Sequence, residues 1–173
     1  MRILNIHGYH GDPHNCAYSS LTKLGHEVFS PAIDYDGTDH AEVLDMLTKA
    51  AGENEVQLVT ATSLGGFYGA LLSVSLGLRA VLINPCLLPF LHLPRLGFQG
   101  DIRPYICSFD RIAGLDREKV LAIVGSRDEV IDSHDFTKDL LGKERVRTVI
   151  GGKHSGATLP LEEFFSEVIG PAE

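Results

Sequence analysis

Short apolar or β-branched runs alternate along this chain with longer segments of helical period. Such alternation is typical of α/β proteins, in which parallel strands form a sheet and helices cover both of its faces. Three of the runs are nearly continuously apolar, as strands buried on both faces are. The pattern therefore predicts about six parallel strands, at Arg2–Ile6, His26–Ser30, Val56–Thr60, Arg79–Ile83, Lys119–Val124 and Arg145–Ile150.

Each segment of helical period is followed by a glycine, which is a common helix stop signal. Asp39 and Glu42 have the spacing of a capping box, and Asp132 is expected to cap the fourth helix. The predicted helices are Asn15–Leu24, Asp39–Ala51, Ser63–Leu76, Ser133–Leu141 and Leu161–Ile169.

The length of 173 residues fits one domain, residues 1–173, and a composition of 44% hydrophobic and 22% charged residues argues against a disordered or fibrous chain. A net charge of −8 without a basic cluster gives little support for nucleic-acid binding. No apolar run approaches the roughly 18 residues that a membrane span needs, and the first residues lack a signal-peptide core. Three separated cysteines without a Cys-x-x-Cys pair suit reduced thiols. We therefore expect a cytoplasmic protein with no membrane partner.

The segment 84–118 breaks the alternation. It holds four prolines and a run of apolar residues, and it is too long for a plain connection. Its apolar side chains either complete the core or form a lid that lines an acyl pocket, and both interpretations stay open. The candidate substrate-binding residues here are Leu88, Phe90 and Leu91.

Ser63 lies between a predicted strand and a predicted helix, in a Gly-x-Ser-x-Gly-like turn with Ala61 in the first position and Gly65 in the last. Such a turn needs small residues on both sides of the serine, because it brings strand and helix backbones close together. The alternative for Ser63 is a plain helix N-cap. A similar pattern around Ser75 follows no strand, so Ser75 is interpreted as an ordinary helical serine.

A nucleophilic serine needs a base, and the base needs an orienting carboxylate. Asp128 and His154 follow the last two predicted strands, so the chain order is Ser, Asp, His, as in α/β-hydrolases. Glu129 and Asp132 compete with Asp128 for the orienting role. A solvated loop histidine is the alternative for His154.

The loop after the first strand supplies a fourth element. In this fold such a loop donates one oxyanion N–H and the residue after the serine donates another, which assigns the backbone of Tyr9 and Leu64. His7 is expected to pack under this loop, and His10 to lie near the substrate mouth. The spacing of His7, His10 and His14 does not amount to a metal site, because glycines and a proline exclude a helix there.

Together these motifs resemble the small bacterial proteins of the YqiA/YcfP type, which are regarded as esterases of the α/β-hydrolase superfamily. The resemblance spans nearly the whole chain. Its most specific pieces are Ser63-Leu64-Gly65-Gly66-Phe67-Tyr68, Ile83-Asn84-Pro85 with Pro89-Phe90, and Asp128-Glu129-Val130-Ile131-Asp132.

The resemblance implies a compact α/β-hydrolase fold, a three-layer sandwich with strand order 2-1-3-4-5-6. It also implies that Ser63 is the nucleophile, Asp128 the orienter and His154 the general base. The chain departs from the family at Ala61-Thr62, where relatives commonly carry Gly or Ser, and the family does not explain His10 or His14.

From the sequence we expect a serine hydrolase of carboxylic esters or thioesters that works through an acyl-enzyme on Ser63, without metal or organic cofactor. The expected partner is a small-molecule ester or thioester, and the expected state is a monomer or small homo-oligomer. One alternative is a binding or regulatory protein that keeps the fold without turnover. Another is an amide or C–C bond hydrolase on the same side chains.

Overall fold

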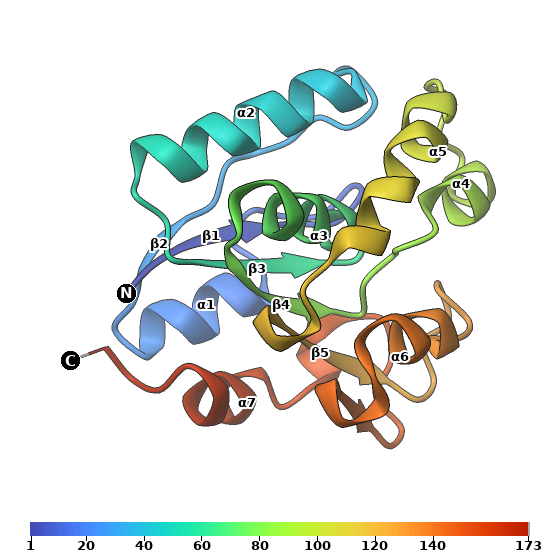
Figure 1. Cartoon of the computed structure of the whole chain (residues 1–173). Coiled ribbons are helices and arrows are strands. Elements are labelled where there is room, and N and C mark those ends of the chain that lie inside the picture. The colour runs from blue at the N-terminus through green and yellow to red at the C-terminus, as the bar shows by residue number, and fades with distance from the viewer. Residues whose placement is uncertain (173) are drawn as a thin grey trace.

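The computed structural model describes residues 1–172. Six parallel strands form one sheet in the order β2-β1-β3-β4-β5-β6, which confirms the expected fold class and strand order. Figure 1 shows the sheet at the centre of the molecule with helices on both sides of it. The strands are β1 (Arg2–Ile6), β2 (Glu27–Phe29), β3 (Leu58–Thr62), β4 (Arg79–Ile83), β5 (Val120–Gly125) and β6 (Val146–Val149).

Alternate residues of the strands point to two separate cores, one on each face of the sheet. Ile3 of β1 packs in a core that α1 (Cys16–Lys23) and α7 (Leu161–Val168) cover. Its neighbour Leu4 packs in the larger core on the other face. Helices α2 (His40–Glu53), α3 (Leu64–Leu76), α5 (Arg103–Phe109) and α6 (Asp135–Leu141) contribute to that larger core.

Several boundaries differ from those expected. Strand β3 lies two residues later than predicted, because its ladder with β4 runs from Leu58 to Thr62. Helix α2 continues through Gly52 to Glu53 and is capped by Asn54.

The expectation that Asp132 caps the fourth helix is wrong. Asp132 has a φ of 63° and turns the chain in the left-handed conformation, which Asp adopts more readily than most residues. Helix α6 therefore begins at Asp135, two residues later than predicted, with His134 at its N-cap.

The segment 84–118 contains α4 (Pro89–His92), a 3₁₀ turn at Leu93–Leu96 and α5, followed by 3₁₀ turns at Asp110–Gly114 and Arg117–Lys119. Its buried side chains join the larger core, as Leu87, Leu93 and Tyr105 show. Leu91 and Leu96 remain 52% and 41% exposed. The segment thus completes the core with one side and leaves apolar side chains at the surface with the other.

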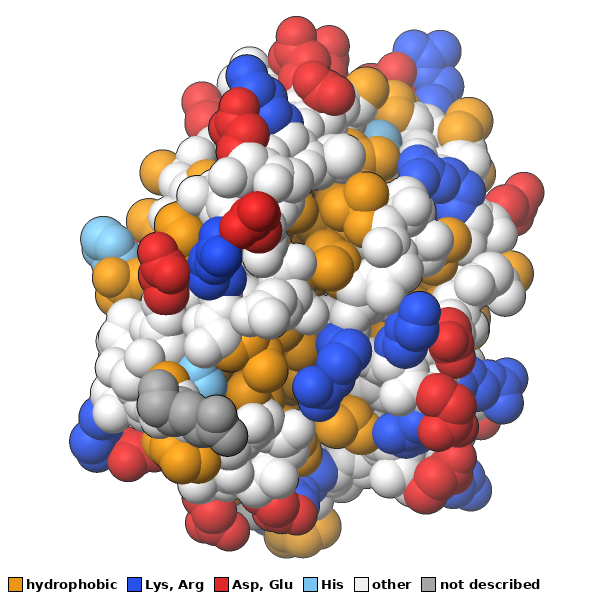
Figure 2. All heavy atoms as spheres, turned by 60° about the vertical axis from the view of Figure 1, so that its left-hand side comes forward, with side chains coloured by type: hydrophobic (Ala, Val, Ile, Leu, Met, Phe, Trp, Pro, Cys, Tyr) orange, Lys and Arg blue, Asp and Glu red, His pale blue; other side chains and the backbone are white. Residues whose placement is uncertain are grey.

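On the face shown in Figure 2, acidic and basic side chains are interspersed, with apolar side chains reaching the surface in patches between them. None of the helices in the described part of the chain has the length and apolar character needed to cross a bilayer.

Candidate active site

Ser63 joins β3 to α3 in a strained turn, with φ 53° and ψ −122°. This left-handed conformation is unfavourable for a residue other than glycine, and such strain is common at functional sites. Ser63 occupies the N-cap position of α3, but its side chain makes no capping hydrogen bond. The hydroxyl is therefore available for a different partner.

Small residues around Ser63 let the turn approach its neighbours closely. A Cβ on Gly65 would lie 2.5 Å from the Ile6 carbonyl oxygen and 2.7 Å from that of His7. Ala61 is accommodated because it faces another glycine, Gly69, where an added Cβ would lie 2.7 Å from the Ala61 Cβ. The turn tolerates alanine in its first position for this reason.

Ser63, His154 and Asp128 form a continuous hydrogen-bonded chain. Ser63 Oγ lies 3.0 Å from His154 Nε2, and His154 Nδ1 lies 2.9 Å from each carboxylate oxygen of Asp128. An ionised carboxylate only accepts hydrogen bonds, so Nδ1 carries the proton and Nε2 is free to accept the Ser63 proton. The structure thus brings together the three side chains that were singled out for the nucleophile, the base and the orienter.

Asp128 is nearly inaccessible and is held by further donors. Its Oδ1 accepts the N–H groups of Val130 and Ile131, each at 2.9 Å, and its Oδ2 accepts from His134 Nε2 at 2.9 Å. Burial alone would raise the pKa of Asp128, but the hydrogen bonds from His134, His154 and the Ile131 N–H outweigh burial and hold that pKa well below its usual range. Asp128 is therefore a permanent anion beside His154.

The two competing carboxylates lie elsewhere. Glu129 accepts the backbone N–H of His154 at 3.1 Å, and Asp132 lies 3.2 Å from the exposed guanidinium of Arg95. The hydrogen bond from the His154 backbone is the main cause that lowers the pKa of Glu129. Neither carboxylate has a hydrogen bond to the His154 ring.

Asn84, directly after β4, anchors the loop that carries His154. Its Nδ2 donates to the carbonyls of Lys153 and His154 at 2.9 and 2.8 Å, and its Oδ1 accepts the Gly125 N–H at 2.8 Å. Asn84 is fully buried with a φ of 42°. Sequence reasoning noted Asn84 only within a family motif, and a polar residue directly after a buried strand was the available signal.

The loop after β1 lies against Ser63. A Cβ on Gly8 would lie 2.8 Å from Ser63 Cβ and 3.4 Å from Ser63 Oγ, so the backbone that leads into Tyr9 passes beside the hydroxyl. Leu64 is the first residue of α3, where N–H groups have no partner inside the helix. Both backbone segments considered as oxyanion donors therefore adjoin Ser63.

His7 is buried under this loop. Its Nδ1 lies 2.8 Å from the Gly8 carbonyl, its Nε2 accepts the Ile33 N–H at 2.9 Å, and the Tyr35 hydroxyl donates to its carbonyl. Both ring nitrogens are occupied by backbone groups. His7 therefore shapes the loop and is unavailable as a base.

His10, considered for substrate binding, is exposed and lies 2.6 Å from an Asp36 carboxylate oxygen. The Tyr9 ring stacks on it, and the Tyr9 hydroxyl donates to the other Asp36 oxygen at 2.8 Å. Burial, together with Asp36, raises the pKa of Tyr9 to about 12. Across residues 1–172, no group of three His, Cys, Asp or Glu side chains is arranged to hold a metal ion.

The candidate residues of segment 84–118 differ in position. Leu88 is half-buried and lines a small cavity of about 20 Å³ with Pro85, His92 and others. Phe90 packs edge to face on Phe109, at 5.4 Å between ring centroids, and Leu91 is exposed. The three side chains thus have different surroundings within the segment.

Cys86 is buried close to this site, and its N–H donates to the Ser63 carbonyl at 2.9 Å. Burial, assisted by the Asp128 charge, raises the pKa of the Cys86 thiol to about 12. A protonated, buried thiol is a poor nucleophile. Cys86 therefore has a structural place beside the serine turn.

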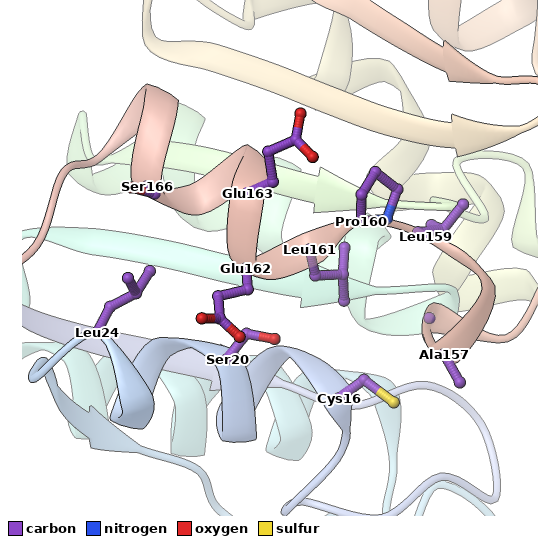
Figure 3. A pocket seen from close by; sticks show the side chains of 11 residues that line it. Cys16, Ser20, Leu24, Ala157, Leu159, Pro160, Leu161, Glu162, Glu163 and Ser166 are labelled. Atoms are coloured by element: carbon purple, nitrogen blue, oxygen red, sulfur yellow. The ribbon is translucent and has the colours of Figure 1, made fainter.

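A larger groove of about 650 Å³ lies between α1 and α7 (Figure 3). Its lining does not include Ser63, Asp128 or His154. It includes Gly156 and Ala157, which follow His154 along the chain.

The sequence matches a known family over residues 2–105, more than half of the chain, and the family is described as "Uncharacterised protein family (UPF0227)". A search of curated proteins finds no match to this chain.

Solved structures similar to this one cover nearly all of the chain. They include a protein assigned to the alpha/beta hydrolase superfamily from Xanthomonas campestris pv. campestris (TM-score 0.69, 17% identity, 97% of each chain covered). The esterase domain of a Rhodothermus marinus protein has a TM-score of 0.68 and 15% identity, with 98% of this chain and 84% of that chain covered. An esterase of Pyrococcus furiosus has a TM-score of 0.61 and 13% identity, with 96% of this chain and 78% of that chain covered. At these identities the likeness is one of fold, and that fold is the one used by α/β-hydrolases.

Proposed function

Since the chain belongs to the uncharacterised protein family UPF0227, the family of the YqiA/YcfP type, we propose that it is a serine hydrolase of carboxylic esters or thioesters. The observation that carries this proposal is the hydrogen-bonded chain from Ser63 Oγ through the His154 ring to Asp128. The strained turn at Ser63 and the fold shared with esterases support it.

In the proposed reaction, Ser63 Oγ attacks the acyl carbonyl carbon while its proton passes to His154 Nε2. Asp128, held as an anion, stabilises the imidazolium that forms. Collapse of the tetrahedral intermediate breaks the bond to the leaving group, and His154 returns the proton to the departing alcohol or thiol. Water then adds to the acyl-enzyme with His154 again as base, which releases the carboxylic acid and restores Ser63.

The oxyanion of the tetrahedral intermediate is proposed to bind the N–H groups of Tyr9 and Leu64, whose backbones adjoin Ser63. One well-placed donor of this kind contributes on the order of a hundredfold or more in rate. No metal or organic cofactor has a role in these steps.

The alternative of a non-catalytic binding protein would gain support from a Ser63 beyond hydrogen-bond reach of His154. The distance of 3.0 Å between Ser63 Oγ and His154 Nε2 argues against it. Amides and activated C–C bonds can be cleaved by the same side chains, so the leaving group is a question for substrate profiling.

The experiment is to measure hydrolysis of p-nitrophenyl acetate, butyrate and octanoate, and of an acyl thioester, by the wild type, by Ser63→Ala and by Ser75→Ala. Ser75 is a matched control because its hydroxyl donates to the Leu71 carbonyl within α3, away from the site. We expect Ser63→Ala to lose at least about a thousandfold in kcat and Ser75→Ala to match the wild type. Undiminished turnover by folded Ser63→Ala would overturn the proposal.

A further inference from the structure

We infer that His134 is a second imidazole of this site, a positioning residue that holds the Asp128 carboxylate for His154. This inference rests on the proposed function. His134 was not among the residues singled out from the sequence, and its hydrogen bond within the site is to Asp128.

The contact between His134 and Asp128 is short and buried. His134 Nε2 lies 2.9 Å from Asp128 Oδ2, and the two side chains are 3% and 1% exposed. The opposite oxygen, Oδ1, is held by the N–H groups of Val130 and Ile131. Donors at both oxygens fix the plane of the carboxylate, and that plane sets the orientation of the His154 ring.

The protonation of His134 follows from its partners. The ionised carboxylate of Asp128 only accepts, so His134 Nε2 carries a proton. His134 Nδ1 is buried and has no hydrogen-bond partner among residues 1–172. His134 therefore acts as a hydrogen-bond donor to Asp128 through Nε2.

The chain returns to Asp128 through one left-handed residue. Asp132, with φ 63°, reverses the backbone after the two N–H donors, and the Ser133 N–H then donates to the Ile131 carbonyl at 2.7 Å. His134 follows directly and opens α6, with its carbonyl accepting the Lys138 N–H at 3.0 Å. The unusual conformation of Asp132 thus places the second imidazole on the carboxylate.

A shared carboxylate has a measurable electrostatic consequence. The hydrogen bond from His134 takes up part of the negative charge that would otherwise act on His154 alone. Its loss raises the pKa of His154, since an anion with fewer donors favours the neighbouring cation more strongly. It also frees the carboxylate to rotate, which disturbs the alignment of the His154 ring and lowers kcat.

Other titratable groups surround the pair: Glu129, whose carboxylate accepts the backbone N–H of His154; Cys86, a buried thiol; and His92 of α4, whose pKa is lowered mainly by burial. None of them is replaced in the variants at position 134, so a change in His154 can be attributed to that position.

The test compares His134→Gln with His134→Asn. The glutamine amide nitrogen reaches the place of His Nε2 and keeps the donor, whereas the shorter asparagine side chain cannot reach Asp128. We expect His134→Asn to lose on the order of tenfold to hundredfold in kcat on p-nitrophenyl acetate with little change in KM. The acid limb of kcat/KM of His134→Asn should move to higher pH by about half a unit. His134→Gln should stay close to the wild type in kcat, in KM and in the position of the acid limb.

His26→Asn is the matched control. His26 is also buried and lies beside the edge strand β2, with Nε2 2.9 Å from the Gly170 carbonyl. Its Nδ1 has no hydrogen-bond partner within the described residues 1–172. The His26→Asn substitution should lower the free energy of unfolding without changing the pH profile of kcat/KM. The inference is overturned when His134→Asn keeps the kcat and acid limb of the wild type, or when Gln and Asn lower kcat equally.

A second readout does not depend on turnover. Titration of the His154 ring by NMR should show a higher pKa in His134→Asn than in the wild type and in His134→Gln. An unchanged His154 pKa in His134→Asn overturns the positioning role even in a protein without esterase activity. Absence of ester hydrolysis in the wild type, in contrast, refutes the proposed function and leaves this titration to decide on His134.

Discussion

Ser63 Oγ lies 3.0 Å from His154 Nε2, although 91 positions separate the two residues along the chain. The contact arises because both residues follow strands of one parallel sheet, β3 and β6, whose carboxyl ends lie at the same edge. Asp128 completes the cluster and follows β5, a strand that lies between β3 and β6 in the sheet.

Replacing Asp128 by Asn should abolish most of the activity. Asparagine has the same size but carries no charge, so it stabilises neither the needed tautomer nor the imidazolium of His154. We expect kcat to fall by roughly a thousandfold to ten-thousandfold, as measured with p-nitrophenyl acetate. Asp132 is a nearby exposed carboxylate that pairs with Arg95, and Asp132→Asn should change kcat by less than about twofold. Equal losses in the two variants would remove Asp128 from its proposed role.

The two glycines Gly65 and Gly52 should respond oppositely to alanine. A methyl group at Gly65 meets the backbone carbonyl oxygens of Ile6 and His7 at 2.5 and 2.7 Å, so Gly65→Ala should destabilise the fold by about 2 kcal/mol or more. Gly52 in α2 has open space around it, and Gly52→Ala should stabilise by about 0.5 to 1 kcal/mol. Urea unfolding measures both. A Gly65→Ala protein as stable as the wild type would contradict the close approach of α3 to β1.

Stability should depend on pH through His40, which is buried against the Tyr68 hydroxyl. Burial, with the Arg111 charge, lowers the pKa of His40 to about 4. An unfolded histidine titrates near pH 6.5, so between these values the unfolded chain binds more protons and the free energy of unfolding falls as pH falls. From pH 7 to 4.5 we expect His40 to account for a loss of about 1 to 3 kcal/mol.

The measurement is urea unfolding of the wild type and of His40→Gln at both pH values. The variant cannot titrate at position 40, so its loss of stability between pH 7 and 4.5 should be smaller. The same loss in both proteins would show that His40 is not the group responsible.

Leu91 tests whether segment 84–118 contacts the acyl chain. Its side chain is 52% exposed, so Leu91→Ser should change the free energy of unfolding by no more than about 0.5 kcal/mol. Burial of a leucine against a substrate chain contributes about 1.5 to 3 kcal/mol at most, so kcat/KM for the octanoate ester should fall several-fold and that for the acetate ester should not. The control is Leu76→Ser, 42% exposed at the end of α3. An unchanged ratio of the two esters in Leu91→Ser would argue against a lid.

Much of the fold could be predicted because its signals are local. The bounds of β1 and β4 agree with those predicted, since apolar runs between polar residues delimit both strands. Residue type and chain order were also enough to group Ser63, Asp128 and His154, because parallel topology brings the carboxyl ends of their strands together.

The remaining features depend on backbone conformations that the sequence does not display. Asp132 was interpreted as a helix cap, and its left-handed turn, which returns His134 to Asp128, became visible only in the structure. Asn84 holds the His154 loop through three hydrogen bonds to distant backbone groups. Such long-range partners follow from the arrangement of strands and not from spacing along the chain.

The central claim is that Ser63 is an activated nucleophile, and covalent labelling tests it most directly. The folded wild type is treated with a fluorophosphonate, and the modified residue is located by peptide mass spectrometry, with Ser63→Ala and His154→Gln treated in parallel. We predict one adduct, on Ser63, that is absent from Ser63→Ala and greatly slowed in His154→Gln. A folded wild type that remains unlabelled at Ser63, or that labels equally fast without His154, would contradict the claim.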